Sequence, residues 1–247
     1  MIGPVLGLLL AAQISAGAIV ARVKENDAKI QDLETLVHMD IVSEKDTKTR
    51  VFELRLKREG TGYRARIFLR EPESMAGTEF LVVAERGKRN RQWAYFPDLG
   101  LTREIAGKSQ EDSFLGSDVT YADLAGGAHL DDLLHRLVGE ETVDGEPCYV
   151  LEGIPKHRIE YGKLRGWIRK KDFVNVKAIF FDEEGRPIKE AYLTDVKDVG
   201  DGVLLAHRIE VRSATENHRT ILTMSGVRVN QGLSAESFTE EALGKGI

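Results

Sequence analysis

The sequence predicts a mainly β protein, built on a single large curved antiparallel sheet with one helical insertion. Three observations support this fold class. Apolar and charged residues alternate along most of the chain, short turns rich in glycine and aspartate separate the alternating stretches, and 24 glycines stand against only 6 prolines. Alternation with a period of two is typical of strands that bury one face, and tight hairpins depend on glycine.

Length and composition narrow the class of protein further. The chain has 247 residues, of which 42% are hydrophobic and 30% charged, as expected of a globular domain. Its formal net charge of −5 argues against a general nucleic-acid binder. The lone cysteine, Cys148, excludes an intramolecular disulfide and a cysteine-based zinc cluster, and we expect it to be a buried, unreactive thiol.

Residues 1–18 have the features of a cleaved signal peptide. Val5–Ala12 is a compact apolar run, Ala16–Ala18 fits the motif before a signal-peptidase cut, and no charged side chain occurs before Arg22. Cleavage would leave a mature domain of residues 19–247, exported to the periplasm.

Two alternatives for this segment are an uncleaved anchor and a buried helix. An anchor needs about 20 predominantly apolar residues, and Gln13 and Ser15 interrupt the run well before that length. One feature counts against a signal peptide: residues 1–4 lack the Lys or Arg that signal peptides usually carry. The shortness of the apolar run counts more strongly against an anchor. We therefore favour the signal peptide and keep the anchor as the alternative.

The elements follow one another as a meander. A short helical pattern over residues 19–30 comes first, and the period then changes to two. About a dozen strands are expected, each with one apolar face, as in a sheet covered on one side. They fall at 33–41, 52–57, 63–70, 78–84, 91–96, 102–106, 139–143, 147–154, 164–170, 174–182, 188–196, 203–212 and 218–229.

Two further segments have helical signals. Leucines recur at helical spacing between Ala122 and Val138, which predicts the one substantial helical insertion. Ser237 and Glu240 form an S-x-x-E capping box that predicts a short C-terminal helix, with Gly244 at its C-cap. Because open sheets of a dozen strands tend to curl, the apolar face would enclose a concavity that these few helices fill only in part. Such a concavity is suited to a lipid.

No motif for catalysis or cofactor binding is present. The sequence lacks G-x-G-x-x-G, a P-loop, H-E-x-x-H and G-x-S-x-G, so we expect neither a catalytic residue nor a cofactor. His129 and His135 are six residues apart and would point away from each other on a helix, so no metal site is expected. The basic stretches 86–91 and 163–171 are interpreted as solvated turns, with docking of an acidic partner or anionic lipid as the alternative.

Several segments resemble the bacterial outer-membrane lipoprotein-sorting protein family, which belongs to the LolA-like carriers. The similar segments occur in the family's order and span nearly the whole mature chain. The sequence departs from the family at one point. An arginine pair is expected at positions 102 and 103, but the residues there are Thr102 and Arg103. The segments are Pro72–Leu81, Trp93–Pro97, Arg103–Ile105, Ser113–Asp118, Tyr121–Leu124, Phe181–Gly185 and Phe238–Leu243.

The resemblance implies a half-open antiparallel barrel of about eleven strands with a helical lid. It also implies a periplasmic carrier that binds the acyl chains of a lipoprotein or lipid and moves them between membranes without catalysis. An inner-membrane transporter and an outer-membrane acceptor would be its partners. A monomer that binds no nucleic acid is the simplest expectation from composition.

The apolar face supplies candidates for contact with an acyl chain, and the stretch from Ser113 to Leu137 is the candidate lid. For each cavity candidate, ordinary packed core is the alternative. The cavity candidates are Val37, Met39, Ile41, Phe52, Leu54, Leu56, Tyr63, Ile67, Leu69, Phe80, Val82, Trp93 and Tyr95. The lid candidates are Phe114, Leu115, Tyr121, Leu124 and Leu133.

Other functional classes stay open at this level. A periplasmic module that senses lipid or lipoprotein and regulates a membrane partner would have the same sequence features. A lipid-modifying enzyme would need a nucleophile beside a base, for example Ser117 beside a histidine and an acid. A purely structural protein would fill the concavity with its own side chains.

Overall fold

The computed structural model describes residues 14–60, 62–85, 88, 90–125, 130–157 and 159–246. Within them, thirteen strands form a single antiparallel sheet, two more than the resemblance implied. The strands are β1 (Asp32–Ser43), β2 (Thr47–Glu59), β3 (Gly62–Glu71), β4 (Glu79–Ala84), β5 (Arg91–Phe96), β6 (Leu101–Glu104), β7 (Leu133–Val143), β8 (Glu146–Pro155), β9 (Lys163–Arg169), β10 (Asn175–Phe181), β11 (Pro187–Asp198), β12 (Leu204–Ser213) and β13 (His218–Val229).

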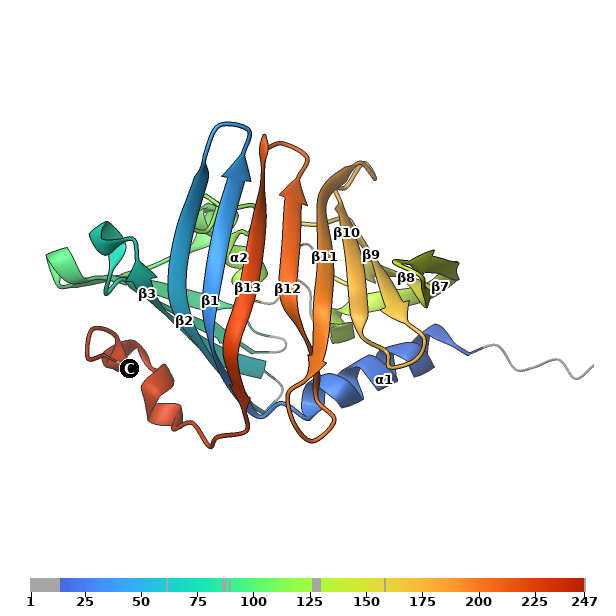
Figure 1. Ribbon diagram of the computed structural model, residues 1–247, viewed down its shortest axis with the longest axis horizontal. Coiled ribbons are helices and arrows are strands. Elements are labelled where there is room, and N and C mark those ends of the chain that lie inside the picture. The colour runs from blue at the N-terminus through green and yellow to red at the C-terminus, as the bar shows by residue number, and fades with distance from the viewer. Residues whose placement is uncertain are drawn as a thin grey trace, which may run out of the picture.

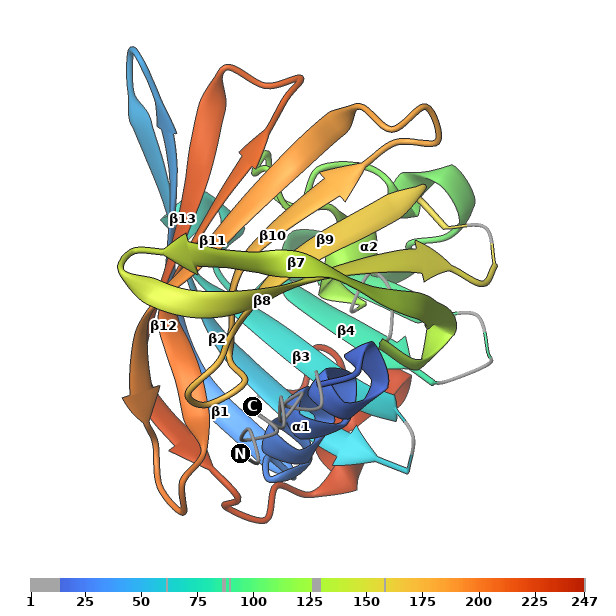
Figure 2. The ribbon, with the colours of Figure 1, turned by 90° about the vertical axis from the view of Figure 1, so that its right-hand side faces the viewer.

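The strand order explains how the chain encloses its own interior. It runs β6-β5-β4-β3-β2-β1-β13-β12-β11-β10-β9-β8-β7, so the first and last strands pair in the middle. The sheet is open, with β6 at one edge and β7 at the other. Figures 1 and 2 show it curving from β4 through β13 to β8, with α1 at its lower end and α2 on its inner side.

The predicted alternation is confirmed along the central strands. In β1, Leu33, Val37, Met39 and Ile41 are buried on the inner face, whereas His38 between them is exposed. Cross-strand partners in a sheet point to the same face, so this inner face continues through β2 and β13. Alternation therefore predicted which side of the central strands is apolar.

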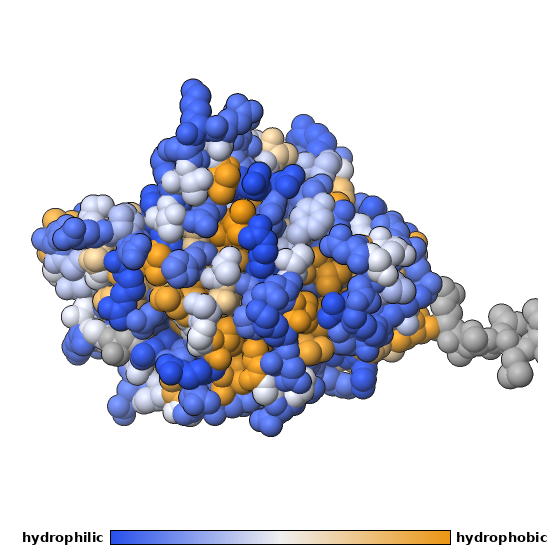
Figure 3. Space-filling view, viewed as in Figure 1, coloured by the Kyte–Doolittle hydropathy of each residue, from blue (hydrophilic) through white to orange (hydrophobic). Residues whose placement is uncertain are grey.

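The outer face of the same strands is mostly hydrophilic. Glu34 of β1 accepts a hydrogen bond from Arg228 of β13 at 2.7 Å and lies 3.3 Å from Arg55 of β2. Figure 3 shows this outer face, where hydrophilic side chains predominate and hydrophobic groups show between them. Among the described residues, no helix is both long and apolar enough to cross a membrane.

Helix α1 (Ala16–Ala28) confirms the helical pattern predicted near the N-terminus. Ser15 caps it by accepting a hydrogen bond from the Ala18 amide at 3.1 Å. Its buried residues Ile19 and Val20 pack against Leu151 and Ile168 of β8 and β9. Residues 1–13, which make up most of the predicted signal peptide, lie outside the described part of the chain.

The prediction of a helix between Ala122 and Val138 is wrong. Among the described residues of this range, only Tyr121–Leu124 forms an α-helix (α2). A 3-10 turn lies at Leu130–Asp132 (η4), and β7 begins at Leu133. Leu133 is buried whereas Leu134 is exposed, which is the alternation of a strand. A short leucine-rich run fits either period, and pairing of β7 with β8 decides for the strand.

The C-terminal helix is also wrong in detail. The segment forms two 3-10 turns, η5 (Ala235–Phe238) and η6 (Glu240–Ala242), rather than one α-helix. Ser234, not Ser237, caps η5, because its hydroxyl accepts from the Glu236 amide at 3.3 Å. The remaining 3-10 turns are η1 (Glu73–Met75), η2 (Pro97–Leu99) and η3 (Gly107–Gln110).

Candidate functional site

The inner face of β1 to β4 carries one apolar cluster. Most of the predicted cavity residues belong to it, and Leu54 of β2 packs against it. Met39 and Leu69 are completely buried. The predicted residues in this cluster are Val37, Met39, Ile41, Phe52, Ile67, Leu69 and Phe80.

The cluster is closed by a residue from the segment that joins the two edges of the sheet. This segment, residues 105–132, leaves β6 and enters β7, and we call it the connector. Its Phe114 is 1% exposed and lies edge-on against Phe80 and Phe52, with ring centroids 5.1 and 6.1 Å away. Tyr121 stacks edge-on against Phe114 at 5.6 Å. In this state Phe114 occupies the apolar face that the sequence predicted as a cavity.

A tight turn presents Phe114 to the sheet. The Phe114 amide donates to the Val119 carbonyl at 2.7 Å, and the Ser117 hydroxyl donates to the Phe114 carbonyl at 2.7 Å. Gly116 sits at φ +80°, a left-handed conformation that glycine adopts without strain. The hydroxyl of Ser117 therefore has a structural role in the turn.

Asp118 fastens this turn to the opposite half of the sheet. Its buried carboxylate accepts from the Thr220 hydroxyl at 2.7 Å and from the Ser213 amide at 2.9 Å, and it lies 2.9 Å from Nδ1 of His218. The Asp118 amide also donates to the Thr220 hydroxyl at 2.8 Å. These contacts join the connector to β12 and β13.

Asp123 of α2 forms a second attachment. It accepts from Nζ of Lys189 on β11 at 2.6 Å and from the Tyr161 hydroxyl at 2.7 Å. Lys189 and Tyr161 are both buried, and burial together with the charge of Asp123 raises the pKa of Tyr161. A buried charge of this kind is tolerated because it is paired. Asp118 and Asp123 thus attach the connector to the sheet. They belong to Ser113–Asp118 and Tyr121–Leu124, two of the segments in which the sequence resembles the lipoprotein-sorting family.

The other predicted lid residues divide between two places. Leu115, Tyr121 and Leu124 are half-buried on the connector and pack against the inner cluster with Phe114. Leu133 instead lies in strand β7, so its predicted place in a helical lid is wrong.

Tyr63 and Val82 lie beside the end of α2. Val82 packs with Ala65 and Ala125, and Tyr63 packs against these three. The Tyr63 hydroxyl donates to the Leu124 carbonyl at 2.8 Å, and burial raises its pKa. Leu56 is half-buried on β2 between its cross-strand partners, Leu33 of β1 and Ala65 of β3.

Trp93 and Tyr95 are on the other face of the sheet. Their neighbour Ala94 belongs to the inner cluster, so alternation turns both rings outward. There Trp93 and Tyr95 pack with Leu81 under Phe238 and Leu243 of the C-terminal segment. The prediction that Trp93 and Tyr95 line the concavity is therefore wrong. The C-terminal segment buries this part of the outer face, so apolar residues occur on both faces of the sheet here.

Strands β11 to β13 carry inner-face residues that the sequence reasoning missed. Leu222, Ile209 and Leu193 continue the row that begins at Met39, as successive cross-strand partners. Met39 is completely buried, but these three side chains remain partly exposed. The alternation in 188–196 and 203–212 could have identified them. The connector therefore covers the inner face less fully toward β11.

The expected buried thiol is present, and no metal cluster is evident. Cys148 is completely buried, and burial raises the pKa of its thiol. In the part of the chain that the structure describes, no three His, Cys, Asp or Glu residues are placed to hold a metal ion.

Known proteins share this architecture. A family model with the description "Uncharacterized protein" matches residues 62–245. No curated protein matches the chain. A DUF1329 family protein from Desulfovibrio piger has the same fold, with a TM-score of 0.85, 28% identity, and coverage of 94% of this chain and 100% of that one.

Two further crystal structures extend the likeness. An outer membrane lipoprotein-sorting protein domain from Vibrio parahaemolyticus has a TM-score of 0.84 and 24% identity, over 91% of this chain and 97% of that one. A LolA superfamily protein from Nitrosomonas europaea has a TM-score of 0.73 and 21% identity, over 94% and 100%. The resemblance drawn from sequence motifs is thus confirmed at the level of the fold.

Proposed function

The chain belongs to the "Uncharacterized protein" family whose model matches residues 62–245 and has the fold of the LolA superfamily, and on this premise we propose that it is a periplasmic lipid carrier. It binds the acyl chains of a lipoprotein or lipid on the inner face of its sheet. It then releases them at another membrane without catalysis.

The observation that carries this proposal is the position of Phe114. Phe114 is the fully buried side chain that the connector adds to an apolar cluster whose other buried members lie on the sheet. Besides this apolar packing, the connector is held by polar contacts through Asp118 and Asp123. Polar contacts can be exchanged for water at low cost when a segment moves, whereas the apolar face beneath requires a new apolar cover.

The energies favour exchange of Phe114 for an acyl chain. Burial of a phenylalanine side chain contributes about 1.5–3 kcal/mol, and each buried CH₂ group of an acyl chain contributes about 0.8 kcal/mol. A chain of about 16 carbons would gain on the order of 10 kcal/mol, part of which offsets ordering of the chain and displacement of the connector. The remainder leaves an affinity that still permits release.

We assign the contacts as follows. The partly exposed residues Leu193, Ile209 and Leu222 receive the acyl chain first. Displacement of Phe114 then extends the site over the inner cluster of β1 to β4, including Phe52, Ile67 and Phe80. Leu54 packs against this cluster on β2, and Leu56 lies two residues further along the same strand, opposite Ala65 of β3.

Delivery completes the proposal. Residues 1–18 direct export and are removed, an inner-membrane transporter loads the carrier, and an outer-membrane acceptor receives the cargo. The protein acts as a monomer. The structural use of the Ser117 hydroxyl in its turn supports binding without covalent chemistry.

A matched pair of variants on one strand tests this function. Leu222 points inward, while its neighbour Thr223 is exposed on the outer face, so Leu222→Glu places a charge in the acyl site and Thr223→Glu does not. We expect Leu222→Glu to weaken binding of a fluorescent fatty acid at least tenfold and Thr223→Glu to leave it unchanged. Full binding by a folded Leu222→Glu protein would refute the assigned site. Native mass spectrometry of the protein from the periplasm would identify its cargo.

A further inference from the structure

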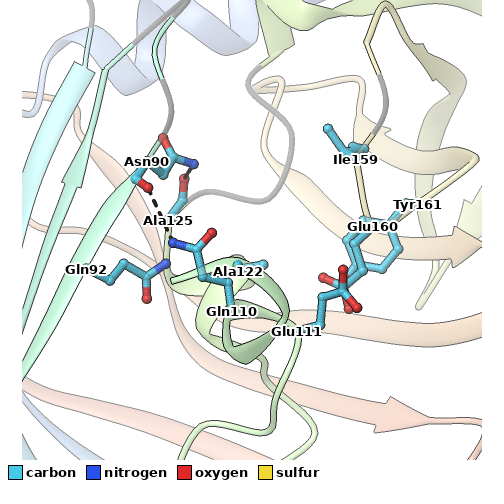
Figure 4. A pocket seen from close by; sticks show the side chains of 10 residues that line it. Asn90, Gln92, Gln110, Glu111, Ala122, Ala125, Ile159, Glu160 and Tyr161 are labelled. Carbon is cyan, nitrogen blue, oxygen red and sulfur yellow. Dashed lines mark hydrogen bonds between the residues drawn. The ribbon is translucent and has the colours of Figure 1, made fainter. Parts of the chain in front are cut away.

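A polar cavity of about 320 Å³ lies beside α2. Figure 4 shows Asn90, Gln92 and Gln110 on one side of it and Glu111 and Glu160 on the other. Asn90 and Gln92 lie at the start of β5, Gln110 and Glu111 at the end of η3, and Glu160 in the link between β8 and β9. Three segments far apart in sequence thus converge on a space at the lower end of the range for small-molecule sites, about 300–1,000 Å³.

The side-chain amides of Asn90, Gln92 and Gln110 all donate hydrogen bonds through their nitrogen atoms to backbone carbonyls. Asn90 donates to the Ala125 carbonyl at 3.3 Å and Gln92 to the Tyr121 carbonyl at 2.8 Å. Gln110 donates to the carbonyls of Asn90 and Ile105 at 3.3 and 3.2 Å. Side-chain amides bonded through nitrogen keep their oxygen as an acceptor.

The Gln110 oxygen faces the cavity (Figure 4), whereas the Gln92 oxygen is enclosed by the protein. Gln92 is 1% exposed, and its Oε1 has no hydrogen-bond partner among the described residues. The oxygen of Gln110 points into the cavity (Figure 4).

The charged residues that line the cavity within the described part of the chain have one sign. Glu111 and Glu160 contribute carboxyl groups, and none of the described lining residues is a lysine or arginine. Lys189 lies nearby, but its ammonium already contacts Asp123 at 2.6 Å and Tyr161 at 2.6 Å. The described lining residues therefore offer hydrogen-bond acceptors and carboxyl groups, which suit a cation with several hydrogen-bond donors.

We propose that this cavity binds a primary ammonium group, and that this group is the polar head of the lipid whose acyl chain lies on the inner face. The second part rests on the proposed carrier function. An ammonium group has three donors and no acceptor, which matches the amide oxygen of Gln110 together with the carboxyl groups of Glu111 and Glu160.

The cavity shares α2 with the acyl site. Ala125 lines the cavity and also packs against Ala65 and Val82 on the inner face. Asn90 and Gln92 hold the carbonyls of Ala125 and Tyr121 at the two ends of this helix. A head group in the cavity and an acyl chain on the sheet would therefore contact the same helix from its two sides.

Ligands with one chain and different heads test the proposal. Octadecylamine, octadecanol and stearate would compete with a fluorescent fatty acid for the full-length mature protein, and ethanolamine alone would be titrated by calorimetry. We expect octadecylamine to bind at least tenfold more tightly than stearate. In the double variant Gln110→Ala/Glu160→Gln, this preference should vanish while stearate affinity stays unchanged.

The control variant Glu104→Gln removes an exposed carboxylate outside the cavity and should keep the preference, which excludes general attraction of a cation to a protein of net charge −5. Equal binding of amine and stearate, or an unchanged preference in the double variant, would overturn the ammonium site and leave the carrier intact. Ethanolamine binding that the double variant abolishes, without binding of any long chain, would keep the site and overturn the carrier. No binding of any of these ligands would overturn both.

Discussion

The Asp118 carboxylate and the Thr220 hydroxyl lie 2.7 Å apart, both buried, although 102 residues separate them in the chain. This bond joins the connector to β13, the strand that pairs with β1 at the centre of the sheet. Its neighbours His218 and the Ser213 amide complete the shell of the carboxylate. The segment that covers the apolar face is therefore attached to the strands farthest from it in sequence.

Replacement of Asp118 by asparagine should loosen the connector. The amide nitrogen of asparagine would face donors that now bond to a carboxylate, which costs about 1–3 kcal/mol of stability. We expect a lower midpoint in urea unfolding and faster association of a fluorescent fatty acid. Asp98→Asn, which changes an exposed residue of η2, is the control and should alter neither. An unchanged association rate in Asp118→Asn would show that this attachment does not gate binding.

Removal of the Phe114 ring should destabilise the empty protein but not the loaded one. Phe114→Ala leaves a cavity in a closed apolar cluster, and such substitutions cost about 3–5 kcal/mol. A bound acyl chain can occupy the vacated space, so saturating fatty acid should raise the melting temperature of Phe114→Ala more than that of the wild type. Equal shifts in differential scanning calorimetry would contradict the exchange of Phe114 for an acyl chain.

Acid should weaken the protein partly through Glu152. Hydrogen bonds from Arg165 and Arg136 to its carboxylate lower the pKa of Glu152 from 4.5 to about 2, in spite of its burial. A carboxyl group with a lowered pKa in the folded state stabilises it above pH 4.5, and this contribution is lost as the pH falls toward 2. Wild type should therefore exceed Glu152→Gln in unfolding free energy at pH 7, and the difference should shrink between pH 4.5 and 2. A constant difference would refute this role, and Glu44→Gln, at an exposed turn, should show none.

The orientation of Trp93 can be measured by fluorescence quenching. Its ring packs under Phe238 on the outer face, away from the proposed acyl site. In a Trp167→Phe background, a bound brominated fatty acid should leave Trp93 emission nearly unquenched, while Phe238→Ala should shift the emission to longer wavelength. Strong quenching by the bound lipid would place the acyl chain near the outer face and contradict the proposed site on the inner face.

Alternation and turns in the sequence were enough to predict most of the sheet. Val37, Met39 and Ile41 form a continuous inner row because a strand sends successive side chains to opposite faces whatever its partners are. The same rule placed Phe52, Ile67 and Phe80 on this face. The signal is local, so it survives without knowledge of the fold.

Local patterns failed where distant segments decide. The leucine-rich residues 133–138 fit the spacing of a helix or a strand, and only hydrogen bonding to β8 selects the strand. The strand predicted at 139–143 is confirmed. Trp93 was predicted on the inner apolar face. It lies on the outer face, which the C-terminal segment buries at this position.

The sequence by itself determined a large antiparallel sheet, the inner face of its central strands and the likeness to the LolA-like carriers. Tertiary structure alone decided that Phe114 occupies that face, that Asp118 and Asp123 hold the connector, and that Gln92 and Glu160 border one cavity. The reason is physical: the direction of a side chain in a strand follows from its neighbours in sequence. What covers it depends on packing and hydrogen bonds between residues that are about a hundred positions apart, as in the bond of Asp118 to Thr220.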